Sequence, residues 1–269
     1  VTKIQYNPRF PISVKMAINV GIKSARNEHI LITTTDATPA SEQWLSMMGK
    51  AFMRGDIVLG YTSIEQGKGL ANYLIRLSRM QISTYWLSRA VVGKTYRGSR
   101  HNIGFTKSLY FSVKGFTHLN MNIGENDLFI QSIAFDNNAS VVLIPKGRMI
   151  ENQWGGLRWW IAHLHHYGEA YRYYPIAARN AMEWDLGSQS LFFLCALVAL
   201  VAMPLEFKAA AALLLLIRYL TAMLRARSIA KRVGEKGVAL RYFIFDIVNP
   251  MLMLCTRIAM MRKDSTAWQ

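Results

Sequence analysis

The sequence predicts an α/β domain followed by membrane helices, and three observations carry this prediction. Short apolar runs alternate with segments of helical periodicity through the first 150 residues. Residues 186–205 then contain no charged side chain, and about 20 such residues suffice to cross the ~30 Å core of a bilayer. The chain is also both apolar and basic, with 52% hydrophobic residues and a net charge of +16. This combination favours a membrane surface over nucleic acid as the partner.

The first 150 residues are expected to fold as alternating strands and helices. β-Branched, apolar runs predict strands at 30–35, 57–61 and 140–145. Apolar residues at helical spacing predict helices over 12–26, 41–54, 70–87 and 106–115, and another from 124 onwards. The loop at 96–102 is polar, basic and glycine-containing between ordered segments, so we expect it to carry function.

Asp36 stands directly after the first of these strands, which we expect to be buried and rigid because it is apolar and β-branched. Ligands bind at the carboxyl edge of open α/β sheets. Ala37 and Thr38 are small enough to let a ligand approach. A second interpretation is that Asp36 only forms or caps a turn.

The composition changes after residue 150. Residues 154–174 are rich in Trp, Tyr, Arg and His, which is typical of a helix lying in a membrane interface. Apolar segments follow at 186–205 and 209–224, and a third at 240–261 either spans the bilayer or lies in its plane. We therefore expect three parts: a cytosolic domain over 1–150, interfacial helices over 151–182 and a membrane region over 183–269.

Charge sets the expected orientation of this multi-pass, inner-membrane protein. The segment 225–236 is strongly basic and is expected to be a loop, which by the positive-inside rule lies in the cytosol. The two apolar segments before it would then form a hairpin, with the α/β domain on the cytosolic side. Arg218 interrupts the second apolar segment, and we expect it to snorkel or to face a partner helix. The alternative is that all the apolar segments are core helices of a soluble protein.

Several motifs follow one another in a definite order. They are Lys15-Met16-Ala17-Ile18-Asn19, Thr34-Thr35-Asp36-Ala37-Thr38-Pro39, Trp44-Leu45, Gly98-Ser99-Arg100-His101-Asn102 and Gly124-Glu125-Asn126-Asp127. This order resembles that of membrane-anchored family-2 glycosyltransferases, the group of the hyaluronan, cellulose and poly-N-acetylglucosamine synthases. The resemblance covers roughly residues 10–260. It implies a partial A-type glycosyltransferase fold (nucleotide-diphospho-sugar transferase) in a fragment that lacks its N-terminal nucleotide-binding portion.

The resemblance also implies a reaction: inverting transfer from a nucleotide-sugar donor to a polysaccharide or lipid-linked acceptor. Asp36 would be the protein ligand of a divalent cation, Mg²⁺ or Mn²⁺, which neutralises charge on the diphosphate. The general base would be Asp127 or Glu125, depending on the register of the acidic motif. Donor or acceptor binding would fall to polar side chains, namely Lys15, Thr34, His101, Asn102, His165 and His166. The expected partners also include the lipid bilayer but no nucleic acid, and the oligomeric state stays open.

Three departures from the family pattern favour a second hypothesis, a non-catalytic scaffold in a polysaccharide assembly. Thr34 replaces the first Asp of its motif, Asn126 interrupts the acidic motif, and no Gln-x-x-Arg-Trp sequence exists. Histidines stand where that last motif is expected. His163, His166 and Glu169 share a helix face and could hold zinc, although an interfacial helix tolerates histidines without metal. A third hypothesis is a basic peripheral protein that binds anionic lipid or nucleic acid through charge alone.

Overall fold

The computed structural model describes residues 3, 14–115, 125–135, 137–152, 155–238 and 241–261. The chain divides into two compact units. The first, here called the α/β unit, holds residues 1–62, 86–142 and 146–149. The second, the helical unit, holds residues 63–85, 143–145 and 150–269. This division differs from the predicted boundaries because residues 63–85 group with the C-terminal helices.

A four-stranded mixed sheet is the frame of the α/β unit, and its strand order is β1-β5-β3-β6. The strands are β1 (His29–Ile32), β3 (Ile57–Gly60), β5 (Ile103–Thr106) and β6 (Ala139–Val142). β5 runs antiparallel to both β1 and β3, whereas β3 and β6 are parallel. Strands β1, β3 and β6 therefore point in one direction, and their carboxyl ends lie at one edge of the sheet.

The strand expected at 30–35 corresponds to β1, but the expectation that it is buried was wrong. Its residues are half-exposed or exposed because β1 is an edge strand with one neighbour. All four residues of β3 are buried instead, and β3 is the interior strand that joins β5 to β6. Strand position, and not apolar content, decides which run is buried, since an interior strand is covered along both edges.

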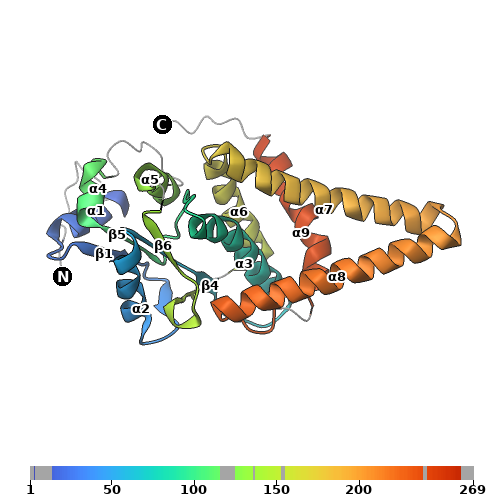
Figure 1. Ribbon diagram of the computed structural model, residues 1–269, viewed down its shortest axis with the longest axis horizontal. Coiled ribbons are helices and arrows are strands. Elements are labelled where there is room, and N and C mark those ends of the chain that lie inside the picture. The colour runs from blue at the N-terminus through green and yellow to red at the C-terminus, as the bar shows by residue number, and fades with distance from the viewer. Residues whose placement is uncertain are drawn as a thin grey trace. The chain divides into compact units, whose positions relative to one another are not determined.

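Helices cover both faces of this sheet (Figure 1). On one face, α2 (Trp44–Ala51) packs through Met48 and Ala51 against Val58 and Val142. On the other face lie α4 (Lys107–Ser112) and α5 (Glu125–Ile133), where Phe105 meets the rings of Tyr110 and Phe129. Helix α1 (Val14–Ser24) agrees with the helix expected at 12–26 within its described residues.

Four strands were not predicted as such, and one of them is β5. The other three form a second sheet of order β2-β7-β4, with β2 (Ala37–Pro39), β4 (Thr62–Ile64) and β7 (Met149–Glu151). Each has three residues, which is too short to display an alternating pattern. Short 3-10 helices follow α2 at Phe52–Arg54 and β6 at Pro145–Gly147.

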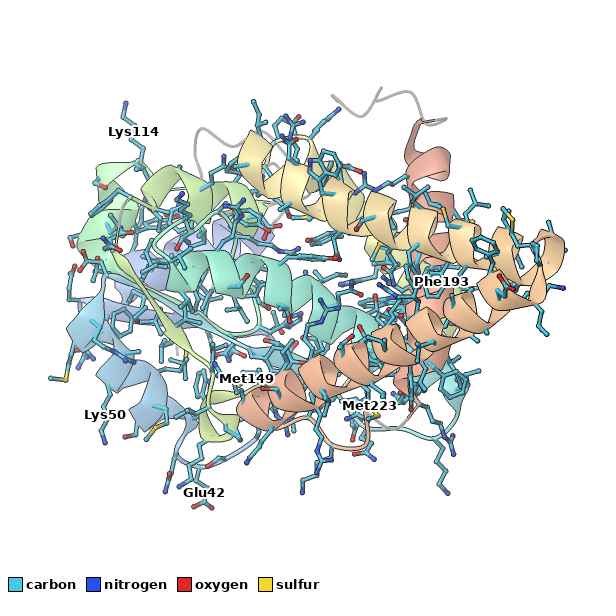
Figure 2. All side chains as sticks on the ribbon, turned by 45° about the vertical axis from the view of Figure 1, so that its right-hand side comes forward. Glu42, Lys50, Lys114, Met149, Phe193 and Met223 are labelled. Carbon is cyan, nitrogen blue, oxygen red and sulfur yellow. The ribbon has the colours of Figure 1, made fainter. Side chains whose placement is uncertain are left out.

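The helical unit consists of long helices. It holds residues 70–85 of α3 (Leu70–Val91), with α6 (Leu157–Tyr171), α7 (Ile176–Ala202), α8 (Leu205–Val233) and α9 (Tyr242–Met261). Helices α7 and α8 form an antiparallel pair that turns at Met203 and Pro204 (Figure 1). Figure 2 shows Phe193 of α7 directed toward α8, whereas Glu42, Lys50 and Lys114 of the α/β unit project outward.

Helices α7 and α8 are long and apolar enough, by length and composition, to cross a membrane. Only 17% and 11% of their most apolar windows are buried, whereas a core helix of a soluble protein would be mostly buried. The prediction of a loop at 225–236 was wrong over most of its length, since α8 continues to Val233. Gly234 ends the helix with φ +78°, the left-handed conformation that glycine adopts without steric cost.

Candidate functional site at the edge of the sheet

Three chain segments meet where β1 and β3 end and β5 begins. Ile32 and Leu59 are both paired with Ile103, the first residue of β5. The segment after β1 carries Thr34 and Asp36, and the segment before β5 carries His101 and Asn102. The sheet thus brings together residues that lie about 65 positions apart in the sequence, and the expectation that Asp36 lies at a carboxyl edge agrees with this geometry.

Asp36, Thr34 and His101 form a compact polar cluster. The Thr34 hydroxyl and His101 Nδ1 are 2.5 Å apart, and the same nitrogen lies 3.5 Å from Asp36 Oδ1. His101 is only 3% exposed. Asp36 Oδ1 is buried and accepts no hydrogen bond, so this carboxylate oxygen keeps unused acceptor capacity beside His101.

The electrostatic surroundings keep Asp36 ionised at neutral pH. Partial burial acts to raise the pKa of Asp36, but the hydrogen bond from Thr34 and the nearby His101 more than compensate, and the pKa is lowered. Arg100 acts in the same direction. A carboxylate in this state suits an electrostatic role near a cation or a hydrogen-bond donor.

Asn102 is the centre of a separate, fully buried hydrogen-bond network. Its side-chain amide donates to the carbonyl oxygens of Tyr61 (2.9 Å) and Gly147 (3.0 Å). Its Oδ1 accepts a hydrogen bond from Trp44 Nε1 at 2.9 Å. Because Asn102 is 0% exposed and both of its N–H groups are used, the structure assigns it to holding the loop in place. The role of Asn102 in donor or acceptor binding stays a prediction, and these buried contacts favour a structural role.

Gly60 is required by the position of Asn102. A Cβ atom at residue 60 would lie 2.2 Å from Asn102 Nδ2. The Gly60 backbone N–H also donates to the Asn102 carbonyl oxygen at 2.9 Å. The backbone of β3 can approach the loop this closely only without a side chain.

Asp127 lies in the first turn of α5 and forms an ion pair with Arg97. Arg97 Nε lies 3.2 Å from Asp127 Oδ2, and the two side chains are 18% and 10% exposed. Arg97 was not among the expected functional residues, although it stands one residue before the glycine of the expected loop. Glu125 is the first residue of α5, and its side chain lies outside the described part of the structure, as does Gly124 of the same motif.

The residues around Asp36 could supply a cation with one carboxylate oxygen and one hydroxyl oxygen. Asp36 Oδ1 fits as one oxygen ligand, with the Thr34 hydroxyl nearby. Within the described residues, no three His, Cys, Asp or Glu side chains gather closely enough to hold a metal ion. A cation bound here would take its other ligands from phosphate and water, a coordination that Mg²⁺ accepts.

The remaining expected site residues lie elsewhere. Lys15 is half-buried on α1. His165 is half-buried on α6 of the helical unit, and the side chains of His166 and Glu169 lie outside the described residues. His163 Nε2 is 3.3 Å from Arg79, and its ring stacks on Trp160 at 5.3 Å. Arg79 in turn forms an ion pair with Glu151 at 2.7 Å, so His163 has a packing role next to a cation.

Arg218 faces a partner helix, one of its two expected positions. Its Nε and one terminal nitrogen each donate to Asp246 of α9 at 3.0 Å. Gln189 of α7 donates to the same carboxylate at 2.8 Å. Arg218 also lies over the rings of Phe192 and Phe193, 5.1 Å and 5.0 Å from their centroids. A charge-assisted network therefore links three apolar helices.

No known protein-family model matches this chain, and no curated protein is significantly similar to it.

Proposed function

We propose that this chain is a membrane-associated glycosyltransferase that uses a nucleotide-sugar donor at the cytosolic face. The observation that carries the proposal is the buried Oδ1 of Asp36 at the carboxyl edge of the sheet, which accepts no hydrogen bond and lies 3.5 Å from His101 Nδ1. An ionised carboxylate held by a short polar cluster is suited to the cation that accompanies a diphosphate leaving group. The order of sequence motifs around Asp36 supports the same assignment.

The proposed chemistry is a single displacement at the anomeric carbon. The acceptor hydroxyl oxygen forms the new C–O bond while the bond to the nucleotide diphosphate breaks. Asp127 accepts the hydroxyl proton, and Arg97, at 3.2 Å, holds the carboxylate in position. Asp36 would hold Mg²⁺ or Mn²⁺, which neutralises the negative charge on the departing diphosphate when bound.

Membrane attachment is part of the proposal and rests on α7 and α8. Their exposed apolar residues would face lipid, with the basic end of α8 on the cytosolic side. Extraction of membranes with alkaline carbonate tests this directly. We expect the chain to stay in the pellet, and its release into the soluble fraction would remove the membrane assignment.

A donor screen tests the activity. Membranes containing the protein are incubated with radiolabelled nucleotide sugars and Mg²⁺ or Mn²⁺. Asp36→Asn keeps the shape and removes the charge, and turnover should fall by about 10²–10³, as for loss of one preorganised electrostatic group. Glu42→Gln is the matched control, because Glu42 is an exposed acid six residues further on. Wild-type turnover in Asp36→Asn at limiting metal would exclude Asp36 from the reaction.

A non-catalytic scaffold in a polysaccharide assembly is the second candidate. Thr34 stands beside Asp36 where the family pattern has a carboxylate, and the Asn102 side chain is buried and bonded within the protein. Two results together would support the scaffold hypothesis. No donor would be turned over, and the chain would remain with the membrane and, after solubilisation, with partner proteins.

A further inference from the structure

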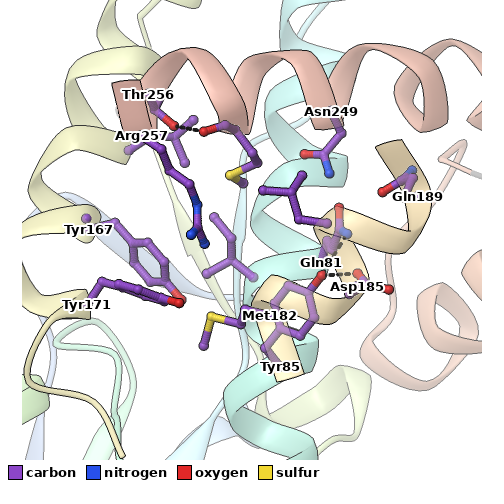
Figure 3. A pocket seen from close by; sticks show the side chains of 15 residues that line it. Gln81, Tyr85, Tyr167, Tyr171, Met182, Asp185, Gln189, Asn249, Thr256 and Arg257 are labelled. Atoms are coloured by element: carbon purple, nitrogen blue, oxygen red, sulfur yellow. Dashed lines mark hydrogen bonds between the residues drawn. The ribbon is translucent and has the colours of Figure 1, made fainter. Parts of the chain in front are cut away.

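The helical unit contains a pocket that the proposed transfer reaction does not use (Figure 3). Four helices contribute to its lining, namely α3, α6, α7 and α9. Figure 3 shows Tyr167 and Tyr171 on one side of the space and Gln81, Tyr85 and Asp185 on the other. The cavity volume is about 90 Å³. At ~15 Å³ per water-sized group this holds a molecular group of roughly six heavy atoms.

Two hydrogen-bond acceptors in the lining have no partner. Asn249 of α9 is 3% exposed, and its Oδ1 is buried and accepts no hydrogen bond. Gln81 of α3 donates to the Tyr85 hydroxyl at 3.1 Å, but its Oε1 is buried and unpaired. A buried acceptor without a donor is costly. The pocket is therefore built for a ligand that brings hydrogen-bond donors.

The charged groups of the lining already have partners, which indicates a neutral ligand. Arg257 forms an ion pair with Glu183 and lies over the ring of Tyr171 at 4.9 Å. Asp185 accepts a hydrogen bond from the Tyr85 hydroxyl. An anionic or cationic ligand would have to break one of these pairs, whereas a hydroxyl group would not.

The source of the ligand follows from the apolar surroundings. Leu164, Met182, Leu186 and Met253 line the same pocket. The helices that bound it also carry exposed apolar side chains, Leu191 and Leu194 on α7 and Met251 and Leu254 on α9. A molecule with an apolar chain can lie against these residues while its hydroxylated end enters the pocket.

We infer that the pocket binds the headgroup of a neutral, glycerol-type lipid such as a monoacylglycerol. One hydroxyl donates to Asn249 Oδ1 and the other to Gln81 Oε1. The glycerol carbons contact Tyr167 and Met182, and the acyl chain leaves along α7 or α9. This inference does not depend on glycosyl transfer, and it assigns the helical unit a ligand of its own.

Photo-crosslinking of the full chain in phosphatidylcholine nanodiscs tests the inference, because that lipid has no hydroxyl donor. The probe is a 1-monoacylglycerol with a diazirine near the carbonyl end of its acyl chain, in the absence of nucleotide sugar. We expect labelled peptides from α6 and α9. Unlabelled monoacylglycerol should compete at least tenfold better than the methyl ester of the same acyl chain. Equal competition by the ester would show apolar binding alone and overturn the inference.

Variants of the lining test the acceptors. Asn249→Leu keeps the branched shape of the side chain and removes the acceptor, so labelling should fall about tenfold, the equivalent of one hydrogen bond to a buried group. Asn180→Leu, on the exposed surface of α7, is the matched control and should label as wild type does. Gly168→Leu should fill the pocket and abolish labelling while circular dichroism and gel filtration stay unchanged. Full labelling in a folded Gly168→Leu variant would place the lipid elsewhere.

Free glycerol distinguishes the two sources of the same headgroup chemistry. We expect it to compete only at concentrations far above those of the lipid, because the acyl chain contributes apolar contacts. Competition at equal concentrations would show a site for a soluble polyol, and the lipid assignment would be wrong.

Discussion

The α/β unit and the helical unit satisfy their buried polar side chains in different ways. In the α/β unit the uncharged side chains bond to the backbone, as Asn102 does to Tyr61 and Gly147 and as Ser140 does to Ala51, and one charge pair joins Arg97 to Asp127. In the helical unit, charged side chains bond mainly to one another. The pairs are Arg76–Glu235 at 2.5 Å, Arg79–Glu151 at 2.7 Å and Arg218–Asp246 at 3.0 Å.

The difference follows from which backbone groups are available. Helices use their own N–H and C=O groups internally, so a buried side chain beside a helix finds few backbone partners. Strand ends and loops leave carbonyl groups open, and an asparagine can bind several of them. Arg76 illustrates both cases, since it also donates to the Lys236 carbonyl at 2.8 Å, beyond the end of α8.

The largest effect is expected where a charge pair is most deeply buried. Arg76 and Glu235 are only 6% and 1% exposed. Glu235→Leu leaves the guanidinium buried without its partner, which should lower the free energy of unfolding by about 3–5 kcal/mol. Denaturant unfolding followed by tryptophan fluorescence measures the loss. The double variant Arg76→Met with Glu235→Leu should recover most of it, and equal destabilisation of both variants would contradict the explanation.

The corresponding test in the α/β unit is Asn102→Ala. It removes the partners of two carbonyl groups and of the Trp44 indole, so we expect a loss of about 3 kcal/mol from unsatisfied buried groups. The same unfolding measurement applies, with Asn27→Ala as control because Asn27 is exposed. If Asn102→Ala kept the wild-type free energy of unfolding but needed more acceptor for turnover, a role of Asn102 in acceptor binding would be supported instead.

A smaller, pH-dependent effect is expected at Tyr73, whose hydroxyl donates to the Val238 carbonyl at 2.8 Å. Burial raises the pKa of Tyr73 to about 12. The folded state therefore keeps a proton that the unfolded state releases near pH 10, so stability falls as the pH rises from 10 toward 12. Tyr73→Phe should cost about 1 kcal/mol at pH 7.

Alkaline unfolding curves check the sign of this effect. The wild-type chain should lose stability more steeply than Tyr73→Phe between pH 10 and pH 12, so its advantage at pH 7 shrinks and then reverses. Parallel curves for the two chains over this interval would show that Tyr73 is not the group responsible.

The smallest effect is expected at the exposed pair of Glu183 and Arg257, whose side chains are 46% and 27% exposed. Solvent and salt weaken such a pair, so Glu183→Gln should change the stability by at most about 1 kcal/mol. Unfolding at low and high salt measures it. If Glu183→Gln lowered the free energy of unfolding more than Tyr73→Phe does, the exposure of a side chain would not predict how much its interaction contributes to stability.

The elements were largely predictable from the sequence because their signals are local. Helical spacing over 41–54 led to α2, and the apolar runs at 57–61 and 140–145 led to β3 and β6. The position of β1 at the edge of the sheet, and therefore its exposure, was not predictable. Strand order depends on pairing with β5, which lies about 70 residues away. The position of Asp36 after a strand was predictable, but its neighbour His101 was identified only from a motif.

The sequence by itself determined where this chain is apolar enough to cross a membrane and where acids follow strands, since hydrophobic period and charge are properties of neighbouring residues. Only the tertiary structure decided that Asn102 belongs to the core, that Arg218 binds Asp246, and that residues 63–85 join the C-terminal helices. Each of these depends on contacts across tens of residues or more. Such contacts form through packing and hydrogen-bond satisfaction in three dimensions, for which a linear pattern carries no signal.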